Sequence, residues 1–438
     1  MKSQSNFSLN WSGNTKATPR IIYPKNLEEL KKIMSEKNFI IAGNQRSFGD
    51  NSINTNLIVS MKNFKQILNF DKAKGIIEAQ SGVLLKDVLG LIVEGGWCVP
   101  VTPGSKYVSI GGMVANNVHG KNITNNQIKH YILELKVLNE KNEIVTCTPT
   151  QNKNYFESTI GGFGLTGCIL SAKFRLKKIN SILMNQEILE FTSYNSFFSI
   201  LEKSNLYEYN VNWIESFGNG SIKGLCYFGK HENNNNSHNL KKFYFKEKEI
   251  NFFNYFILKI FTQNYYLIKL TKFIFRKFKK IFYKKVSGFD EFFYPQDYFI
   301  NWNKIYGKNG FFQAQFLVKE NNFKDIMSKI AKFFKDEKNF STFIIIKKFD
   351  EKGKYLNFYG QGFSISMDIP INSKFEKTKN FLNSIFQEYD IKINFSKDSI
   401  ANKDVIKNKE EYSEFIKELN FINPERKFNS IFSKRLEI

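Results

Sequence analysis

The sequence predicts a protein that mixes helices and strands in two large domains, or in one domain with a large insertion. Its 438 residues are about three times an ordinary domain length. Hydrophobic residues make up 42% and aromatic residues 16% of the chain, which is enough to bury a core and excludes wholesale disorder. The pattern also changes along the chain, from short alternating elements over roughly the first 180 residues to a longer aromatic and basic stretch.

Short helices and strands alternate in the first part. A helix is expected over residues 26–36, because Asn26 can cap its start and Glu29 stands at the capping-box position. A second helix is expected over 84–96, where Gly95 and Gly96 end it. Short apolar runs predict strands at 39–43, 57–61, 75–80, 132–138, 143–147 and 168–176, with a hairpin between the fourth and the fifth.

The middle of the chain has a different composition. Residues 231–240 are expected to form a polar, low-complexity loop, and residues 241–286 are dense in Phe, Tyr, Ile and Lys. The run 273–285 alternates aromatic and basic residues, and three interpretations compete: a partly buried helix with a solvated Lys face, an amphipathic surface against anionic lipid, and a stacking platform for single-stranded nucleic acid. Further strands are expected at 311–318, 342–349 and 363–369, with a helix at 322–336.

Charge and cysteine content limit the classes of function. The net charge of +23 suits anionic partners, but only six of the 64 basic residues are Arg, which argues weakly for nucleic acid. The four cysteines form no CxxC pair, so neither a metal site nor a disulfide framework is expected, and a reducing compartment is the default. The first residues lack the apolar core of a signal peptide, and the most apolar stretch, 252–275, is too charged for a spanning helix.

Residues 162–167 form a literal GxGxxG motif. A dinucleotide-binding fingerprint needs a strand before this motif and a helix after it. Here a helix is expected before it, at about 152–159, and a strand after it, at 168–176. The order of elements therefore excludes the ordinary nicotinamide-binding interpretation.

Two other turns rich in small residues are better candidates for a ligand site. Residues 42–51 follow a predicted strand, and the backbone N–H groups of such a turn can cradle a pyrophosphate. Residues 103–105 and 109–122 contain Gly111 and Gly112, where a flat ligand can approach the backbone closely. His119 lies in this second turn, and both a structural and a functional role are open for it.

At these residues the chain resembles a known family. Arg46-Ser47-Phe48-Gly49-Asp50, Ser109 to Asn122 and Ile160 to Gly167 are similar to motifs of FAD-linked oxidases of the vanillyl-alcohol-oxidase type. Within that family the resemblance is strongest to the decaprenylphosphoryl-β-D-ribose oxidase group, the flavoprotein subunit of an epimerase. It extends to Phe293–Asp297, Gly310–Phe316, Gly362–Pro370 and the motif Phe395-Ser396-Lys397-Asp398-Ser399, and so covers nearly the whole chain except the poorly matched 180–290.

The resemblance implies an α+β fold with a PCMH-type FAD-binding domain and an inserted substrate domain built on an antiparallel sheet. By this comparison the FAD-binding domain spans residues 1–180, the substrate-binding domain 181–391, and a C-terminal return to the FAD-binding domain 392–438. The cofactor is FAD. The residues that the resemblance places around it are Ala42, Gly43, Asn44, Gln45, Arg46, Ser47, Phe48, Gly49, Asp50, Asn51, Gly104, Ser109, Ile110, Gly111, Gly112, Asn116, Asn117, Val118, His119, Ile169 and Asn394.

The same resemblance implies the catalytic and substrate-binding residues. Lys397 falls on the essential lysine of the family, where a cation can stabilise reduced flavin and hold a substrate hydroxyl. His119 is the second expected catalytic residue, orienting flavin and substrate. The expected substrate-binding residues are Lys121, Gln313, Gln315, Lys347, Phe293, Ser364 and Ser366, among which lysine suits a phosphate and the amides suit hydroxyls.

Several positions depart from the family pattern. Phe48 stands where the group has Tyr and where covalent relatives have a flavin-linking His, so FAD is expected to be non-covalent. Phe293 replaces a Tyr, Ser366 a Cys and Ser364 an Asn, which bears on substrate fit. Asn394 replaces a flavin-contacting Tyr, and Gln45 replaces a Gly of the first turn.

The activity that the resemblance implies is oxidation of the 2'-hydroxyl of a polyprenyl-phosphate-linked pentose to a keto sugar, the first half of an epimerisation in cell-wall or surface polysaccharide (arabinan) biosynthesis. A separate NAD(P)H-dependent keto-reductase would complete the epimerisation. The lipid-linked phospho-sugar places the protein in the cytoplasm, at the inner face of the membrane as a peripheral protein. Two alternatives stay open: an FAD-dependent oxidase of a soluble sugar, alditol or aldonolactone, and a basic nucleic-acid-binding protein without a redox role.

Overall fold

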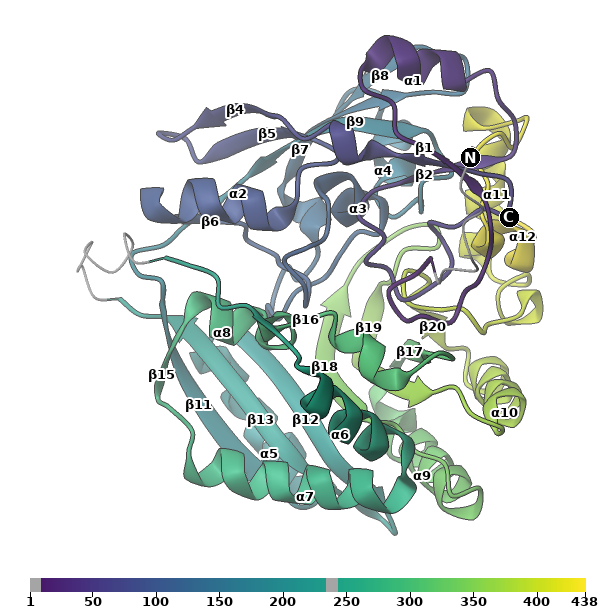
Figure 1. The fold of residues 1–438 in the computed structure, drawn as a ribbon. Coiled ribbons are helices and arrows are strands. Elements are labelled where there is room, and N and C mark those ends of the chain that lie inside the picture. The colour runs from purple at the N-terminus through teal and green to yellow at the C-terminus, as the bar shows by residue number, and fades with distance from the viewer. Residues whose placement is uncertain (1–8, 234–242) are drawn as a thin grey trace.

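The computed structural model describes residues 9–233 and 243–438 and contains both helices and largely antiparallel sheets (Figure 1). The predicted α+β class is confirmed. The polar loop expected at 231–240 lies mostly outside the described residues. The helices are α1 Leu27–Ile33, α2 Leu85–Ile92, α3 Ile110–Ala115, α4 Lys153–Thr159, α5 Tyr194–Leu201, α6 Phe252–Gln263, α7 Tyr265–Ile281, α8 Phe289–Phe293, α9 Glu320–Asp336, α10 Phe375–Glu388, α11 Glu410–Ile422 and α12 Ile431–Leu436.

Two small sheets form the part of the chain that precedes residue 180. The parallel sheet has the order β1-β3-β2, and the antiparallel sheet has the order β4-β5-β9-β7-β8. The predicted hairpin is confirmed, since β7 and β8 pair with each other. The bounds are β1 Arg20–Ile22, β2 Phe39–Ala42, β3 Leu57–Ser60, β4 Ile67–Asp71, β5 Ile76–Gln80, β6 Trp97–Cys98, β7 Ile132–Leu138, β8 Ile144–Cys147, β9 Cys168–Arg175 and β10 Lys177–Lys178, with β6 and β10 forming a two-stranded pair.

Local signals at the first helices act as the sequence suggests. The Asn26 side chain accepts from the backbone N–H of Glu29, while the Glu29 carboxylate accepts from the N–H of Lys25. Gly96 ends the second helical segment with φ of 77°, a left-handed conformation that glycine adopts without steric cost. The GxGxxG turn lies between α4 and β9, so the exclusion of a dinucleotide fingerprint is confirmed.

An eight-stranded sheet dominates the second part, with the order β15-β11-β13-β12-β18-β19-β17-β20 (Figure 1). Every one of its pairings is antiparallel. One face packs on α5 and α9 through a core that contains Phe197, Phe323 and Phe363. The bounds are β11 Leu183–Phe191, β12 Tyr209–Gly218, β13 Ser221–His231, β14 Lys248–Glu249, β15 Val286–Gly288, β16 Phe299–Ile300, β17 Phe311–Val318, β18 Phe343–Glu351, β19 Gly360–Pro370 and β20 Lys392–Ile393, with β14 and β16 forming a small separate pair.

The opposite face of this sheet lines a cavity at one end and contacts helix α7 at the other. Cross-strand partners in a sheet point to the same side, and Trp213 pairs with Ile345, which pairs with Ser366, which pairs with Gln315. At one end of this face the side chains line a cavity. At the other end Trp213 meets Phe275 of α7, with ring centroids 5.0 Å apart. The cavity and α7 therefore lie on the same side of the sheet.

The C-terminal segment contacts both parts of the molecule. β20 joins the large sheet at β17, whereas Phe39 of β2 accepts the backbone N–H of Asn429 and packs on Phe428. Arg435 binds Asp50 through two hydrogen bonds of 2.9 and 3.0 Å, and it forms an ion pair of 3.0 Å with Asp398. This Arg435 clamp joins the turn that follows β2 to the turn that carries Lys397. The domain boundaries at residues 180 and 391 stay predictions.

Candidate active site

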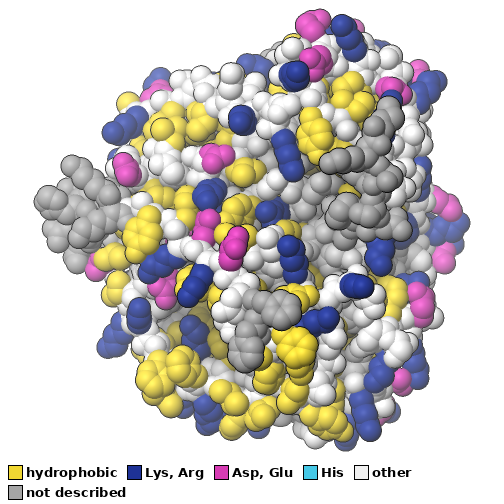
Figure 2. Space-filling view, in the orientation of Figure 1, with side chains coloured by type: hydrophobic (Ala, Val, Ile, Leu, Met, Phe, Trp, Pro, Cys, Tyr) yellow, Lys and Arg dark blue, Asp and Glu magenta, His cyan; other side chains and the backbone are white. Residues whose placement is uncertain are grey.

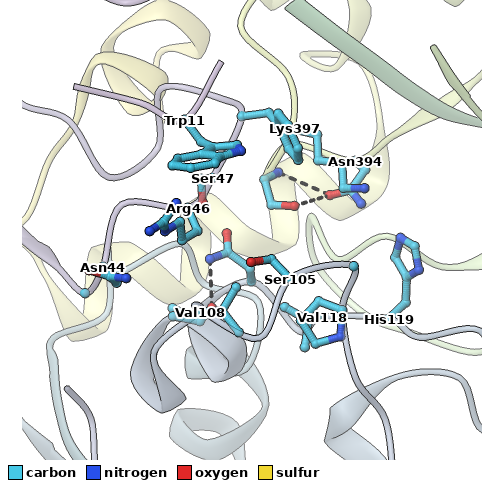
Figure 3. A pocket seen from close by; sticks show the side chains of 18 of the residues that line it. Trp11, Asn44, Arg46, Ser47, Ser105, Val108, Val118, His119, Asn394 and Lys397 are labelled. Atoms are coloured by element: carbon cyan, nitrogen blue, oxygen red, sulfur yellow. Dashed lines mark hydrogen bonds between the residues drawn. The ribbon is translucent and has the colours of Figure 1, made fainter. Parts of the chain in front are cut away.

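A cavity of about 310 Å³ lies between the N-terminal turns and one face of strands β17, β18 and β19. Figure 3 shows Lys397 and Asn394 entering it from the C-terminal turn, and Ser105, Val108 and Val118 on the other side. The structure thus brings together segments that are hundreds of residues apart. The predicted site residues that line the cavity are Gly43, Asn44, Gln45, Arg46, Ser47, Phe48, Asn51, Gly104, Ser109, Gly111, Gly112, Asn116, Val118, His119, Lys121, Ile169, Phe293, Gln313, Gln315, Lys347, Ser364, Ser366, Asn394 and Lys397.

Five residues predicted to contact the cofactor do not line the cavity: Ala42, Gly49, Asp50, Ile110 and Asn117. Ala42 and Ile110 are buried in the hydrophobic cores, because their side chains point away from the turn. The Asp50 carboxylate is held by Arg435, and the Asn117 amide donates to Gln127 over 3.1 Å. These residues support the cavity wall from behind.

The lining residues fit a flavin nucleotide. Several buried polar atoms there have no hydrogen-bond partner among the described residues, and such atoms are costly unless a ligand or water satisfies them. They include Gln45 Nε2, Arg46 Nε, Asn51 Oδ1, Ser52 Oγ, Ser81 Oγ and His119 Nδ1. A ligand with many polar atoms, as FAD has, would satisfy this set.

Glycine is required at two positions of this wall. A Cβ atom at Gly43 would lie 1.9 Å from Ser109 Oγ, and one at Gly111 would lie 2.7 Å from the Cβ of Ser81. The two glycine-rich turns therefore pack against each other without room for side chains. Their contact fixes the shape of one end of the cavity.

Aromatic rings hold Arg46 at that end. Its guanidinium lies 3.8 Å from the ring centroid of Trp11 and 5.0 Å from that of Tyr107. Stacking of this kind immobilises a guanidinium while leaving its N–H groups free to bind a phosphate or a carbonyl. Trp11 was not predicted as a site residue, because nothing in its local sequence marks it.

Three lysines make the other end of the cavity electropositive. Among the described residues, Lys121, Lys347 and Lys397 form no ion pair with a carboxylate, although the charges of Asp297 and Asp368 act on Lys121 and Lys397 at longer range. Lys121 Nζ donates to the carbonyls of Phe292 and Phe293 over 2.6 and 2.8 Å, and Lys347 Nζ donates to the carbonyl of Gly120 over 2.8 Å. This end of the cavity suits an anionic ligand.

Burial lowers the pKa values of these cations. Desolvation lowers the pKa of Lys121 to about 7. It lowers the pKa of Lys397 to about 8, although the charge of Asp368 acts in the opposite direction. The pKa of Lys347 falls well below its usual value through desolvation and the neighbouring lysines. A bound anion would reverse these shifts, since opposite charge favours the ammonium form.

His119 is neutral and forms part of a network of amides. Its pKa is lowered well below the usual value by burial and by Lys347 and Lys397. Gln315 Nε2 lies 3.0 Å from His119 Nε2 and donates to Ser364 Oγ over 2.8 Å. The amide of Asn394 in turn donates to Gln315 Oε1 over 2.9 Å. The network orients Gln315 and His119, while His119 Nδ1 has no hydrogen-bond partner in the described part of the chain.

Asp368 is a carboxylate behind the cavity that the sequence did not mark as a site residue. It accepts a hydrogen bond from Gln313 Nε2. Burial raises its pKa to about 6, with the Gln313 hydrogen bond and the charge of Lys397 opposing that rise. Asp368 therefore orients the Gln313 side chain, and its charge raises the pKa of Lys397.

Other lining residues escaped the sequence analysis as well. Trp302 and Asp297 line the cavity, and Asp297 accepts the backbone N–H of Lys106 over 2.7 Å. Asp297 ends the segment Phe293–Asp297 that resembles the family, but neither residue was predicted as a site residue. The Phe48 ring packs on Trp302 and Phe311, and the Lys397 ammonium lies 5.8 Å from its centroid. A non-covalent FAD, as expected from Phe48, stays a prediction.

Within the ranges 9–233 and 243–438, no cluster of His, Cys, Asp and Glu has the arrangement of a metal site. The four cysteines are buried and free. The lining side chains of the cavity offer amines, amides, hydroxyls, one imidazole, the Arg46 guanidinium and the Asp297 carboxylate.

Comparisons with known proteins agree with this site. Residues 18–148 match a family model described as an FAD binding domain. The chain is 23% identical to decaprenylphosphoryl-β-D-ribose oxidase from Mycolicibacterium smegmatis over 91% of this chain and 89% of that protein. It is 22% identical to D-arabinono-1,4-lactone oxidase from Candida glabrata and 21% identical to L-gulonolactone oxidase from Mus musculus. Those two matches span 42% and 37% of this chain, and 37% and 38% of the respective relatives.

Proposed function

We propose that this chain, an FAD-dependent oxidoreductase of the FAD-linked oxidase type that acts on CH–OH groups, oxidises the 2'-hydroxyl of a polyprenyl-phosphate-linked pentose. The observation that carries the proposal is the extent of similarity. The similarity to decaprenylphosphoryl-β-D-ribose oxidase covers 91% of this chain, whereas the matches to the two lactone oxidases cover 42% and 37%. The redox-free nucleic-acid-binding alternative is inconsistent with this enzyme class.

The cavity supports a phosphorylated substrate. Lys121 and Lys347 lie in its wall without a carboxylate partner, and each can form a charge-assisted hydrogen bond to a phosphate oxygen. A neutral lactone would bring no negative charge to this end of the cavity. We therefore assign the phosphate of the substrate to the end of the cavity that holds these two lysines.

The hydroxyl that reacts would lie near Lys397. Gln315, His119 and Asn394 are bonded to one another, so their free polar atoms have fixed directions and can orient a sugar hydroxyl. With a pKa of about 8, Lys397 is partly neutral near pH 7 and can accept the hydroxyl proton in that form. FAD, when bound, supplies the acceptor for the hydride that leaves the same carbon. The residues that would hold it are the unpartnered groups of the N-terminal turns, including Gln45, Arg46 and Ser81.

A keto sugar formed in this way must be reduced on the other face to give an epimer. This step requires a hydride donor, so a separate NAD(P)H-dependent keto-reductase is the partner that the proposal needs. Such a partner would act on a product that carries the same lipid and phosphate.

The proposal is tested by comparing substrates with the FAD-loaded enzyme. Turnover would be measured on a polyprenyl-phospho-ribose, on the same sugar phosphate without the lipid, and on a free aldonolactone, with a dye as electron acceptor. We expect the highest kcat/KM for the lipid-linked sugar. A higher kcat/KM for the lactone would favour the alternative, an oxidase of soluble sugars. The similarity to two lactone oxidases is the observation that supports this alternative.

A further inference from the structure

Helix α7 lies on the large sheet with Lys272 and Arg276 inward and most of its apolar side chains outward. Arg276, 6% exposed, is paired with the carboxylates of Glu190 and Glu215 on the strands below. Lys272, 8% exposed, donates to the carbonyl of Ser341 over 2.8 Å. A helix on a water-soluble protein ordinarily turns its apolar stripe toward the core. The polarity of α7 is inverted over these positions.

The outward face of α7 forms a continuous apolar stripe. Spacings of three, four and seven residues place side chains on one side of a helix. The exposed apolar residues on this face of α7, with the residue that follows the helix, are Tyr266, Leu270, Phe273, Ile274, Phe278, Ile281 and Phe282, of which Ile281 is 71% and Phe282 64% exposed. Phe256 and Ile260 of α6 extend the stripe. These nine residues are called the α6–α7 surface below.

Figure 2 shows apolar side chains along the lower edge of the molecule, where Figure 1 places α6 and α7. Monomeric soluble proteins rarely leave large aromatic and aliphatic side chains this exposed in one contiguous patch. Such a patch marks a surface that another apolar phase covers.

The charges around the patch identify that phase. From Ile250 to Phe289 the sequence contains no Asp or Glu, while Lys269, Lys277 and Lys280 lie among the exposed apolar residues, followed by Lys284 and Lys285. Two copies of this face would bring like charges together, which disfavours self-association. Aromatic residues flanked by lysines match the interface of a bilayer that carries anionic lipid.

We propose that the α6–α7 surface binds the interfacial region of an anionic membrane, with both helices lying in the membrane plane. Among the described residues, no helix is long and apolar enough to cross a bilayer, so the contact is peripheral. The pairing of Arg276 and the bond of Lys272 keep the two inward cations on the sheet. The apolar stripe is then free to enter the lipid.

The location of the surface relates it to the cavity. Val211 lines the cavity, and Trp213 and Glu215, on the same face of the same strand, hold α7 through Phe275 and Arg276. Thr262 and Gln263 at the end of α6 bond to the carbonyls of Ile305 and Tyr306, in the 3₁₀ segment that starts at the cavity residue Trp302. Membrane contact would therefore hold the cavity beside the lipid surface. This inference rests on the surface alone and does not require the proposed substrate.

The test is binding of the FAD-loaded full chain to vesicles, measured by co-sedimentation without substrate. Vesicles of phosphatidylcholine alone would be compared with vesicles that contain phosphatidylglycerol. We expect binding to the anionic vesicles that weakens as salt is raised. The double variant Phe278→Ser, Ile281→Ser should lose about tenfold or more in affinity, because it removes two side chains that enter the lipid.

The matched control is Phe421→Ser, which removes a phenyl ring that is 84% exposed on α11, outside the α6–α7 surface. It should bind vesicles as the unaltered protein does. Equal binding by the double variant and the control would overturn the proposal. It would also be overturned if light scattering showed the unaltered protein to be a dimer and the double variant a monomer. Retained flavin and an unchanged melting temperature show that the double variant is folded. Its turnover on a lipid-free sugar phosphate separates this test from that of the proposed function.

Discussion

Two groups of buried cations lie on the same side of the large sheet, and they differ in what neutralises them. In the cavity, Lys347 is bonded to a backbone carbonyl, and no carboxylate among the described residues pairs with it or with Lys397. Under α7, Arg276 has the carboxylates of both Glu190 and Glu215, whereas Lys272 donates to the carbonyl of Ser341. A buried charge without a partner is costly. The cavity lysines can gain an opposite charge from a ligand, whereas Arg276 is neutralised within the protein and helps to determine how α7 is oriented.

The largest expected effect follows from removing a cavity cation at the reacting position. Lys397→Ala should leave FAD bound and lower turnover by about 10²- to 10⁴-fold, the range that general acid–base groups contribute. The visible spectrum of the purified variant and its kcat would be measured together. The control is Lys348→Ala, a lysine on the solvent side of β18. Near-normal turnover of Lys397→Ala would remove this residue from the mechanism.

The next effect concerns the paired cation under α7. Arg276→Ala leaves two carboxylates, Glu190 and Glu215, largely buried without their shared partner, and we expect the free energy of unfolding to fall by about 3 kcal/mol. Urea titration of the holoenzyme would measure this loss. The adjacent exposed Lys277→Ala is the control and should change the stability little. A loss in Arg276→Ala no larger than in the control would show that the paired charges do not hold the helix.

A smaller effect is expected for an unpaired cation that binds substrate. Lys347→Gln should raise KM for the sugar phosphate by about 10- to 100-fold, which corresponds to one charge-assisted hydrogen bond. It should leave stability unchanged or improved, because it removes an uncompensated charge. Steady-state kinetics and thermal unfolding check both parts, with Lys348→Gln as the control. A large loss of stability without a change in KM would contradict the assignment.

The smallest effect is a displacement of the pH profile. If neutral Lys397 accepts the proton, kcat/KM rises as pH increases through about 8, because the ammonium form cannot accept one. Asp368→Asn removes a negative charge that raises the pKa of Lys397, so the rising limb should move to lower pH by less than about one pH unit. A kcat/KM that falls instead of rising as pH increases through about 8 would show that Lys397 acts in its charged form.

Much of the fold follows from local sequence signals. Asn26 with Glu29 marks the start of α1, and the strand after Gly167 correctly excluded a dinucleotide fingerprint. The orientation of α7 was not predictable, because it depends on Glu190 and Glu215 in strands that precede the helix by dozens of residues. Its alternating composition alone permitted three different interpretations.

The same distinction, between local sequence signals and contacts of residues distant in sequence, applies to the candidate site. The glycine-rich turns are local features that residue order marks, whereas Lys397 was assigned through the resemblance of its motif to a family. Trp11 and Asp368 were missed, because each acts through a partner that is distant in sequence: Trp11 through Arg46, and Asp368 through Gln313 and Lys397. Asp50 was expected to contact the cofactor; it does not line the cavity, and its carboxylate binds Arg435, which is also distant in sequence.

The Arg435 clamp has a consequence for how the protein is made. The turns of the first cavity wall end at His119, and about 280 residues must follow before Lys397 is synthesised. At rates of 5–20 residues per second this interval lasts on the order of 15 to 60 s on a ribosome. Arg435 is synthesised later still, so the hydrogen bonds that hold the turn at Asp50 can form only at the end of synthesis. A nascent chain therefore carries an open, unsatisfied nucleotide cradle for most of its synthesis, and the supply of free flavin during that interval becomes a factor in the yield of active enzyme.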